Sequence, residues 1–429
     1  MKTLCLIGII LLGGVCCAVI LTFNMSLFSC TVTLTYLLIA AMVAFTYHNY
    51  GGDYEPSCTV LIPAYNEGEF VLRSIASIAE CDYPGLRIIV IDDGSSDDTW
   101  QWIEKAKRLH PGIQTIRSPR NEGKKHALYR GILQSDSEIF VTVDSDSSVA
   151  PDAIRNLVRP FADPKIGAVA GNILVENIKE GVIPRMMDII FTFSYEFLRS
   201  SQSRCGSVLC TPGALSAYRQ KAVLPLLDEW LNQTFLGEKT RIGEDRALTS
   251  MLLRQGWQVV YQESAQAYTR MPVGYRGVCR MLLRWVRGDI RENLLLFPFV
   301  CRNLSVRRPR SLGLLIHYLA FAIGTMAPAL LVPVTLGYLL CHPEERLVLG
   351  EFFLSVTLLW AVIPALVYAR KQSIPASLHS FTYSIFALLL LNWVPIYALL
   401  TLKNNRWLTR GGKPSAPDAP ESAQHHARG

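Results

Sequence analysis

Long apolar runs at both ends of the chain constrain its fold more than any other sequence feature. Residues 4–23 and 27–47 form two runs, each of about the 20 residues that a helix needs to cross a bilayer. Three further runs occupy residues 312–340, 347–369 and 376–402. Hydrophobic residues make up 50% of the 429-residue chain, more than an ordinary soluble enzyme carries. We therefore expect a multi-pass membrane protein with a separate domain between its membrane segments.

The basic residues beside the apolar runs predict which side of the membrane each loop occupies. Lys2 before the first run would also fit a cleaved signal peptide, but a second run follows and no small-residue cleavage site is evident. The basic loops at residues 307–310, 370–371 and 403–413 should all face the cytosol. Three single crossings would place the last of these loops outside. We therefore expect the final run, which contains Pro395, to combine a re-entrant or interfacial helix with one crossing, or to form two short tilted helices.

Charge is concentrated beside the membrane segments. Residues 270–310 hold ten arginines and two acids, a net charge of +8, so the rest of the chain sums to −1 against a total of +7. Arginine in this setting suits anionic headgroups and diphosphates. No nucleic-acid-binding module accompanies it, so we expect no nucleic-acid partner. The eleven cysteines are scattered without metal-ligand spacing, which is typical of reduced thiols in a cytosol-facing protein.

The middle of the chain has a different pattern. Short β-rich runs at residues 59–62, 88–91 and 139–143 alternate with helical patterns such as 97–108 and 124–134. This alternation predicts an α/β domain with a mainly parallel sheet. Ligands of such sheets bind beyond the carboxyl ends of the strands, which is where Asn66, Asp93 and Asp144 fall.

The segments at these strand ends suit a nucleotide and a metal ion. Carboxylates of Glu67 and Asp93 can accept hydrogen bonds from a base and a ribose, and Tyr65, next to Ala64, can stack on the base. Ser95, Ser96 and Asp97 would equally suit a turn with a helix cap. Asp144 and Asp146 are two apart on a strand and should point the same way. Mg²⁺ or Mn²⁺ commonly takes one or two such carboxylates plus substrate phosphates.

Two later motifs suit group transfer to a hydroxyl. Glu244, Asp245 and Arg246 precede an apolar helix, and one carboxylate, which we assign to Asp245, could act as general base. Simple N-terminal capping of that helix is the alternative. Arg284 could pair with a diphosphate leaving group, and Trp285 could stack under an acceptor sugar or serve only as an interfacial anchor.

One further basic segment completes the expected site. Lys124 and Lys125 follow Gly123 at the start of a predicted helix, where they could hold the nucleotide or its phosphates. A solvated basic face would have the same composition.

From Cys58 to Arg410 the chain resembles the processive, membrane-integrated family 2 glycosyltransferases, most closely bacterial hyaluronan synthases. The resemblance rests on DDGS, DSD and GEDR at residues 92–95, 144–146 and 243–246, and on NQTFLG at residues 232–237. It implies a cytosolic GT-A (Rossmann-like) domain inserted between N-terminal and C-terminal transmembrane helices of a cell-membrane protein. It also implies Mg²⁺ or Mn²⁺, UDP-sugar donors, inversion, and export of the growing polysaccharide through the same chain. A monomer in the lipid bilayer is compatible with it.

The resemblance also assigns residues. The segment at 210–219 is similar to the family's acceptor site, which implies acceptor roles for Cys210, Pro212 and Tyr218 alongside Trp285. The segment at 406–410 is similar to a gating loop over the nucleotide, which implies that Trp407, Thr409 and Arg410 contact it. Two positions depart from the family pattern: Met281 replaces a glutamine, and Leu408 replaces a glycine.

Together these patterns divide the chain into six parts. They are two N-terminal membrane helices (1–50), a catalytic domain (51–270), arginine-rich interface helices (271–310), C-terminal membrane or re-entrant helices (311–402), a gating loop (403–413) and a disordered tail (414–429). The predicted activity is hyaluronan synthesis from UDP-N-acetylglucosamine and UDP-glucuronate. Synthesis of a glucose/glucuronate capsule, chitin or poly-N-acetylglucosamine, single transfer to a lipid phosphate, and a scaffold with an inactive transferase domain are the alternatives.

Overall fold

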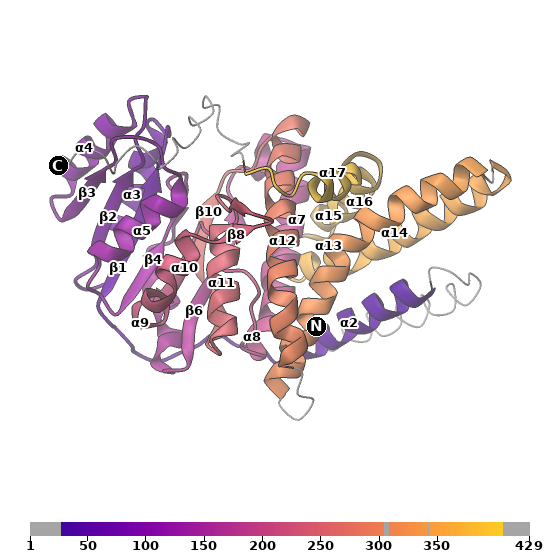
Figure 1. Ribbon diagram of the computed structural model, residues 1–429, viewed down its shortest axis with the longest axis horizontal. Helices are drawn as coiled ribbons and strands as arrows, with labels where there is room; N and C mark the ends of the chain where they lie inside the picture. Colours follow the sequence, from indigo (N-terminus) through magenta and orange to yellow (C-terminus); the bar gives the residue numbers. More distant parts are fainter. Residues whose placement is uncertain (1–26, 304–308, 342, 406–429) are drawn as a thin grey trace, which may run out of the picture.

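The computed structural model describes residues 27–303, 309–341 and 343–405. Its α/β domain lies at one end, and two long helices, α13 (Pro309–Cys341) and α14 (Arg346–Ala369), extend away from the sheet at the other (Figure 1). Helix α12 (Tyr275–Arg302) lies between these two parts.

The domain is built on an eight-stranded mixed sheet of order β3-β2-β1-β4-β7-β6-β10-β5. Four of its seven neighbouring pairs are parallel, namely β1 with β2, β1 with β4, β2 with β3 and β6 with β10. A separate hairpin consists of β8 and β9. The strands are β1 (Cys58–Ala64), β2 (Arg87–Asp92), β3 (Ile113–Arg117), β4 (Ile139–Thr142), β5 (Ser147–Val149), β6 (Ile166–Val175), β7 (Ser216–Arg219), β8 (Thr234–Phe235), β9 (Glu238–Lys239) and β10 (Gln258–Thr269).

Helices cover the sheet and connect it to the apolar segments. In the domain they are α3 (Phe70–Ala79), α4 (Thr99–Leu109), α5 (Lys124–Gln134), α6 (Ala153–Val158), α7 (Val182–Thr192), α8 (Ser200–Arg204), α9 (Gln220–Val223), α10 (Leu227–Leu231) and α11 (Glu244–Arg254), with the π-helix η3 (Phe193–Arg199) and the 3-10 turns η1 (Arg159–Ala162), η2 (Ile178–Glu180) and η4 (Leu224–Leu226). Outside it are α2 (Leu27–Phe45), α12, α13, η5 (Pro343–Glu345), α14, α15 (Ile374–Ser377), α16 (His379–Phe386), the π-helix η6 (Ala387–Leu391) and α17 (Trp393–Leu400).

These elements confirm the α/β domain that the sequence predicts. The three expected strands are β1, β2 and β4, and the two expected helices are α4 and α5. The sheet is less regular than the βα alternation suggests, because β7 runs antiparallel to both of its neighbours, β4 and β6. This short strand follows the loop at 205–215 and enters the middle of the sheet from it.

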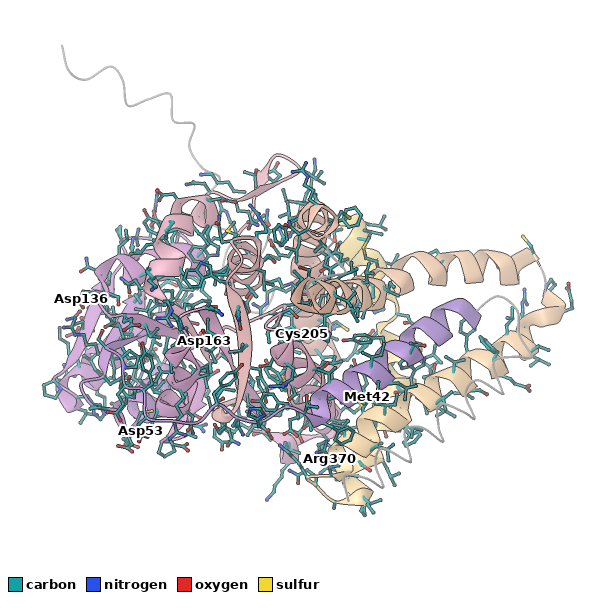
Figure 2. All side chains as sticks on the ribbon, turned by 90° about the horizontal axis from the view of Figure 1, so that it is seen from below. Met42, Asp53, Asp136, Asp163, Cys205 and Arg370 are labelled. Carbon is teal, nitrogen blue, oxygen red and sulfur yellow. The ribbon has the colours of Figure 1, made fainter. Side chains whose placement is uncertain are left out.

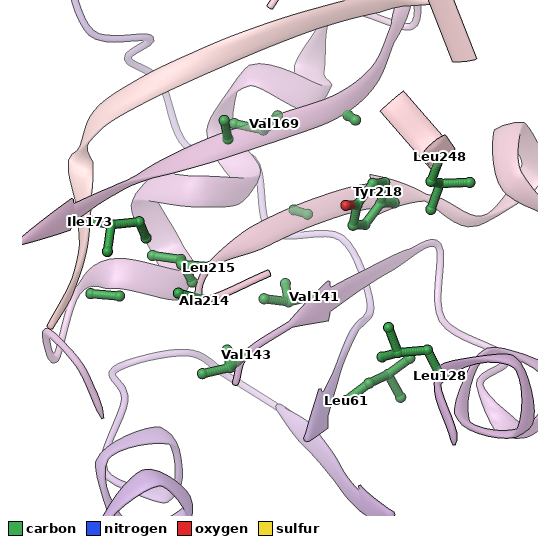
Figure 3. Close-up of a cluster of buried hydrophobic side chains, with 14 of the residues drawn as sticks. Leu61, Leu128, Val141, Val143, Val169, Ile173, Ala214, Leu215, Tyr218 and Leu248 are labelled. Atoms are coloured by element: carbon green, nitrogen blue, oxygen red, sulfur yellow. The ribbon is translucent and has the colours of Figure 1, made fainter. Parts of the chain in front are cut away.

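One apolar core joins the sheet to the helices beside it. Leu61, Val141 and Tyr218 from the sheet pack with Leu128 of α5 and Leu248 of α11 (Figure 3). The same core continues into α12 and into the C-terminal segment around α17. Burial of apolar surface therefore fixes α12 against the domain.

The described part of the chain contains two helical segments long and apolar enough to cross a membrane, Arg346–Ala369 and Ile374–Leu391. Shorter apolar helices cover Thr35–Phe45 and Ser311–Met326. The expected first crossing at residues 4–23 lies outside the described residues. The last apolar run is broken into α15, α16, η6 and α17, with Pro395 in the first turn of α17, where a proline costs no hydrogen bond.

Polar contacts and a small apolar cluster attach the long helices to the domain. Tyr368 of α14 donates a hydrogen bond to Asp188 of α7 at 2.6 Å, and the Lys371 ammonium lies 2.9 Å from Glu196 of η3. Leu37 of α2 packs with residues of η3 and α14. Figure 2 shows Met42 of α2 beside α14 and Arg370 at the end of α14. The domain and the apolar helices thus form one body.

Gly94, directly after Asp93, adopts a positive φ of +71°, and a Cβ there would lie 2.4 Å from the Arg120 carbonyl carbon. We expect Gly94→Ala to destabilise the protein by about 1–3 kcal/mol, because the side chain is strained and collides with backbone. Gly112→Ala is the control, since nothing lies within 4 Å of that Cβ. Thermal unfolding of both variants measures the difference, and equal midpoints would contradict the assignment.

Candidate active site

The centre of the site is the ammonium group of Lys124, the first residue of α5. It lies 2.5 Å from Asp144, just after β4, and 2.8 Å from Glu244, the first residue of α11. Asp245 is close enough for its charge to act on the same ammonium. Carboxylates from two separate segments therefore converge on one half-buried cation.

Asp93 fixes the position of this cation. Its two carboxylate oxygens accept hydrogen bonds from the backbone N–H groups of Glu122 at 3.1 Å and Gly123 at 2.7 Å. These are the two residues before Lys124, so the end of β2 holds the start of α5. Burial is the main reason that the pKa of Asp93 is raised to about 6.

Gly213 brings the predicted acceptor segment, residues 210–219, to the same point. Its N–H donates to the Asp245 carboxylate at 3.2 Å. A Cβ at this position would lie 2.6 Å from the Lys124 nitrogen and 3.3 Å from the Asp144 oxygens. A side chain at this position would displace the Lys124 ammonium from its place beside Asp144.

Their surroundings shift the pKa values of the neighbouring Glu244 and Asp245 carboxylates in opposite directions. Burial, followed by the Glu244 charge, raises the pKa of Asp245 to about 6. Burial acts on Glu244 as well, but the Lys124 ammonium outweighs it and holds the pKa of Glu244 below its ordinary value. Burial also opposes the charge of Lys124, and the three acids nevertheless raise its pKa. Asp245 is therefore the stronger base of the pair.

Arg246 has a different surrounding from the two acids. Its guanidinium donates to the Leu209 carbonyl and, at 2.9 Å, to Asn293 of α12. It also lies 4.6 Å from the centre of the Phe321 ring. The predicted catalytic role of Arg246 stays a prediction, and these contacts suit a link between the domain and α12.

Arg284 and Trp285 lie on α12 beside this cluster. The charge of Arg284 acts on Glu244, which places the guanidinium at the acid pair. The Trp285 ring is partly buried against the core, with its centre 6.1 Å from that of Phe191. Met281, one turn earlier, is buried in the same core.

The remaining acceptor residues are partly structural. The Tyr218 hydroxyl pairs with Thr211 at 2.8 Å, and its ring stacks on Phe140, so it belongs to the sheet core. The Pro212 carbonyl accepts a hydrogen bond from Ser216 at 2.6 Å. Cys210 is half-buried, and its pKa is raised to about 12, mainly by burial. Of these three residues, Cys210 is the one that is not fully buried, and the acceptor roles of all three stay predictions.

The ends of β1 and β2 are joined by polar contacts. Asn66, with a φ of 52°, accepts a hydrogen bond from the Ser96 N–H at 2.9 Å. Glu67 accepts one from the Ser145 hydroxyl at 3.1 Å, which connects it to the Asp144–Asp146 segment. Ala64 is buried and Tyr65 half-buried at this edge. The carboxyl ends of β1 and β2 thus hold all four of these predicted nucleotide-binding residues, Ala64, Tyr65, Glu67 and Asp93.

The donor set at the end of β4 fits a divalent cation. Asp146 is exposed, and Asp144 is half-buried two residues before it. The described residues contain no group of three or more histidine, cysteine or acidic side chains with metal-ligand geometry. An ion that takes one or two carboxylates and completes its shell with phosphates and water needs no such group.

Lys125 has different direct contacts from its neighbour Lys124. Its ammonium donates to Thr240 at 3.2 Å and lies 5.4 Å from the centre of the Trp230 ring, and burial lowers its pKa to about 8. The Trp230 N–H donates to the Glu244 carbonyl at 2.9 Å. The predicted nucleotide-binding role of Lys125 stays a prediction.

Asn405 is a residue that sequence reasoning missed. Its side-chain amide donates to the Lys239 carbonyl at 2.7 Å and accepts from Arg291 of α12. Arg291 also donates to the Ile242 carbonyl at 3.2 Å. The segment before Glu244 is therefore held by α12 and by Asn405, which lies near the start of the predicted gating loop. Trp407, Thr409 and Arg410 lie outside the described residues.

This arrangement, with acids at the carboxyl ends of strands in an α/β domain, defines a GT-A-like glycosyltransferase. The Glycosyl transferase family 2 profile matches residues 59–226. The chain is 31% identical over 420 residues to a hyaluronan synthase of Streptococcus pyogenes, covering 94% of this chain and 97% of that protein. It belongs to the family 2 glycosyltransferases.

Two other proteins show the range of similarity. An N-acetylglucosaminyltransferase of Rhizobium sp. is 35% identical over 367 residues, which cover 84% of this chain and 78% of that protein. A mannosyltransferase of Pyrobaculum calidifontis, solved with GDP-mannose and Mn²⁺, shares the fold with a TM-score of 0.58 at 21% identity, over 90% of this chain and 97% of that one.

The pKa of Asp245 predicts the pH dependence of activity. A base must be deprotonated, so activity should fall about tenfold per pH unit below pH 6. Lys124→Gln removes a charge that favours the ionised form, and the inflection should move to higher pH. Lys125→Gln is the matched control, because this ammonium faces Thr240 instead, and it should leave the inflection in place. Rates of UDP release between pH 4.5 and 8 test both expectations, and an unmoved inflection in Lys124→Gln would contradict the first.

Proposed function

We propose that the protein is a processive, membrane-embedded, inverting β-glycosyltransferase that polymerises UDP-activated sugars and translocates the product. The observation that carries this proposal is the convergence of Asp144, Glu244 and Asp245 around Lys124, with Arg284 and Trp285 on the adjoining helix. A single site thus offers a base, cations for a diphosphate and a platform for a sugar ring.

The chemistry follows from these positions. Asp245 takes the proton of the acceptor hydroxyl as that oxygen attacks the anomeric carbon, and UDP leaves from the opposite face. Arg284 pairs with the leaving diphosphate. Trp285 stacks under the acceptor ring and keeps its hydroxyl directed at Asp245. Glu244 stays ionised beside Lys124 and keeps the pKa of Asp245 high.

Asp146, together with Asp144, would hold Mg²⁺ or Mn²⁺ with the diphosphate of the donor. When bound, such an ion neutralises negative charge on the phosphates. Asp93, Glu67 and Tyr65 bind the uridine at the neighbouring strand ends.

Membrane attachment is supported by the two long apolar segments, Arg346–Ala369 and Ile374–Leu391. The contacts of α14 with α7 and η3 keep them next to the acceptor side of the domain. A cell-membrane protein with a cytosolic catalytic domain accounts for these contacts, and the same helices would form the path for the polymer.

N-acetylglucosamine is the sugar that both similar bacterial enzymes suggest. Hyaluronan, which also requires UDP-glucuronate, is the polymer expected from the sequence. A homopolymer of N-acetylglucosamine is the second candidate, favoured by the 35% identity to the rhizobial N-acetylglucosaminyltransferase.

Donor specificity tests the proposal directly. Purified protein is given UDP-sugars singly and in pairs, and UDP release and polymer are measured. Hyaluronan requires both UDP-N-acetylglucosamine and UDP-glucuronate and is degraded by hyaluronan lyase, whereas a homopolymer needs the first donor alone and is degraded by chitinase. If the protein releases UDP from none of these donors, the proposed activity is wrong.

Two substitutions separate chemistry from acceptor binding. Asp245→Asn should bind UDP normally and lose at least about 100-fold in transfer, because the base is absent. Trp285→Ala should retain donor binding and make short products or none, because the acceptor loses its stacking surface. UDP affinity and product length are measured for both. Long chains from either variant would contradict the role given to that residue.

A further inference from the structure

The face of α12 that carries Trp285 also carries residues that lie near the proposed base, Asp245. Trp285, Asp289 and Asn293 are spaced four residues apart, so they lie on the same side of this helix, about 6 Å from one to the next. Trp285 contacts Phe191, and Asn293 accepts the hydrogen bond from Arg246. Asp289 therefore lies between the stacking platform and the segment at Leu209.

Asp289 is also close to the acid pair. Its neighbour Gly288 approaches Gly243, with a Cβ on Gly243 only 3.3 Å from the Gly288 Cα. The charge of Asp289 acts on Cys210, and the charges of Arg246, Asp245 and Arg199 act on Asp289. The carboxylate thus lies within electrostatic range of Cys210 and of the proposed base, Asp245.

Among the residues that the structure describes, none pairs with the Asp289 carboxylate. Asp289 is half-buried and forms no hydrogen bond or ion pair with any other residue that the structure describes. The two nearby arginines have other partners. Arg246 donates to Leu209 and Asn293, and Arg199 donates to the Cys210 carbonyl and to Ser194 at 2.8 Å while its guanidinium lies 3.8 Å from the centre of the Tyr195 ring.

We propose that Asp289 is an acceptor-contacting residue that selects an uncharged sugar end over one that carries a carboxylate. A half-buried carboxylate accepts hydrogen bonds from hydroxyl or acetamido N–H groups. It repels a uronate at the same position, because two like charges in a partly desolvated site are strongly disfavoured. The inference rests on the proposed polymerase, and it favours the N-acetylglucosamine homopolymer among the two products named there.

The test uses full-length protein in lipid nanodiscs with UDP-N-acetylglucosamine as donor. Two acceptors of equal length are compared, a chitotriose and a hyaluronan trisaccharide that ends in glucuronate at its non-reducing end. The variants are Asp289→Asn and, as the matched control, Glu292→Gln, because Glu292 is an acid on the same helix that faces Gln233 instead, at 2.9 Å. UDP release gives kcat and KM for each acceptor, and release without acceptor reports the donor site.

The wild-type protein should use the neutral acceptor with at least about tenfold higher kcat/KM, the usual size of a charge-assisted contact. Asp289→Asn should reduce this preference to about twofold or less, chiefly through KM and with donor hydrolysis unchanged. Glu292→Gln should keep the wild-type preference. The preference should also shrink below pH 6 in the wild type, where Asp289 becomes protonated, and stay constant in Asp289→Asn.

Other results overturn the inference. If the wild type uses both acceptors equally, Asp289 has no role in selection. The same holds if Asp289→Asn lowers kcat/KM for both acceptors by the same factor. Neither result affects the proposed polymerase. Absence of UDP release from every donor would reject the polymerase and the inference together.

Discussion

The ion-pair cluster around Lys124 is the interaction on which the site depends. Three acids placed this close, and partly out of water, could not all stay ionised without a cation between them. Lys124 supplies it, and Asp93 holds Lys124 in place through the two N–H groups before it. The charge of Lys124 therefore fixes the end of β4, the start of α5 and the start of α11 relative to one another. The same balance leaves Asp245 with a pKa near neutrality, where a base is most useful.

Helix α12 connects this cluster to the apolar part of the chain. Gly243 and Gly288 allow α11 and α12 to approach closely, and Arg291 and Asn405 hold the segment that precedes α11. Movement of the C-terminal helices would therefore be transmitted to the acid pair through side chains that are fully buried, such as Arg291. The polymerase proposed above would move its product after each addition, and these contacts would link that movement to the acid pair.

Sequence patterns predicted the parts of the site that depend on backbone alone. Asp93 and Asp144 come together because both follow parallel strands, and that rule needs no knowledge of packing. The partner of Lys124 could not be predicted in this way. Lys124 and Lys125 are adjacent in a basic pair, and only the docking of α10 and α11 shows that one meets the acids and the other meets Trp230. Tyr218 likewise became a core residue because β7 enters the sheet antiparallel between β4 and β6.

Asp289 was within reach of sequence reasoning, since it follows Trp285 at helical spacing. What the pattern lacks is the commitment of Arg199 and Arg246 to other partners, which leaves the carboxylate for a ligand. Trp285 and Asp289, two of the residues proposed to contact the acceptor, lie on one face of α12, apart from the strand ends proposed to hold the nucleotide.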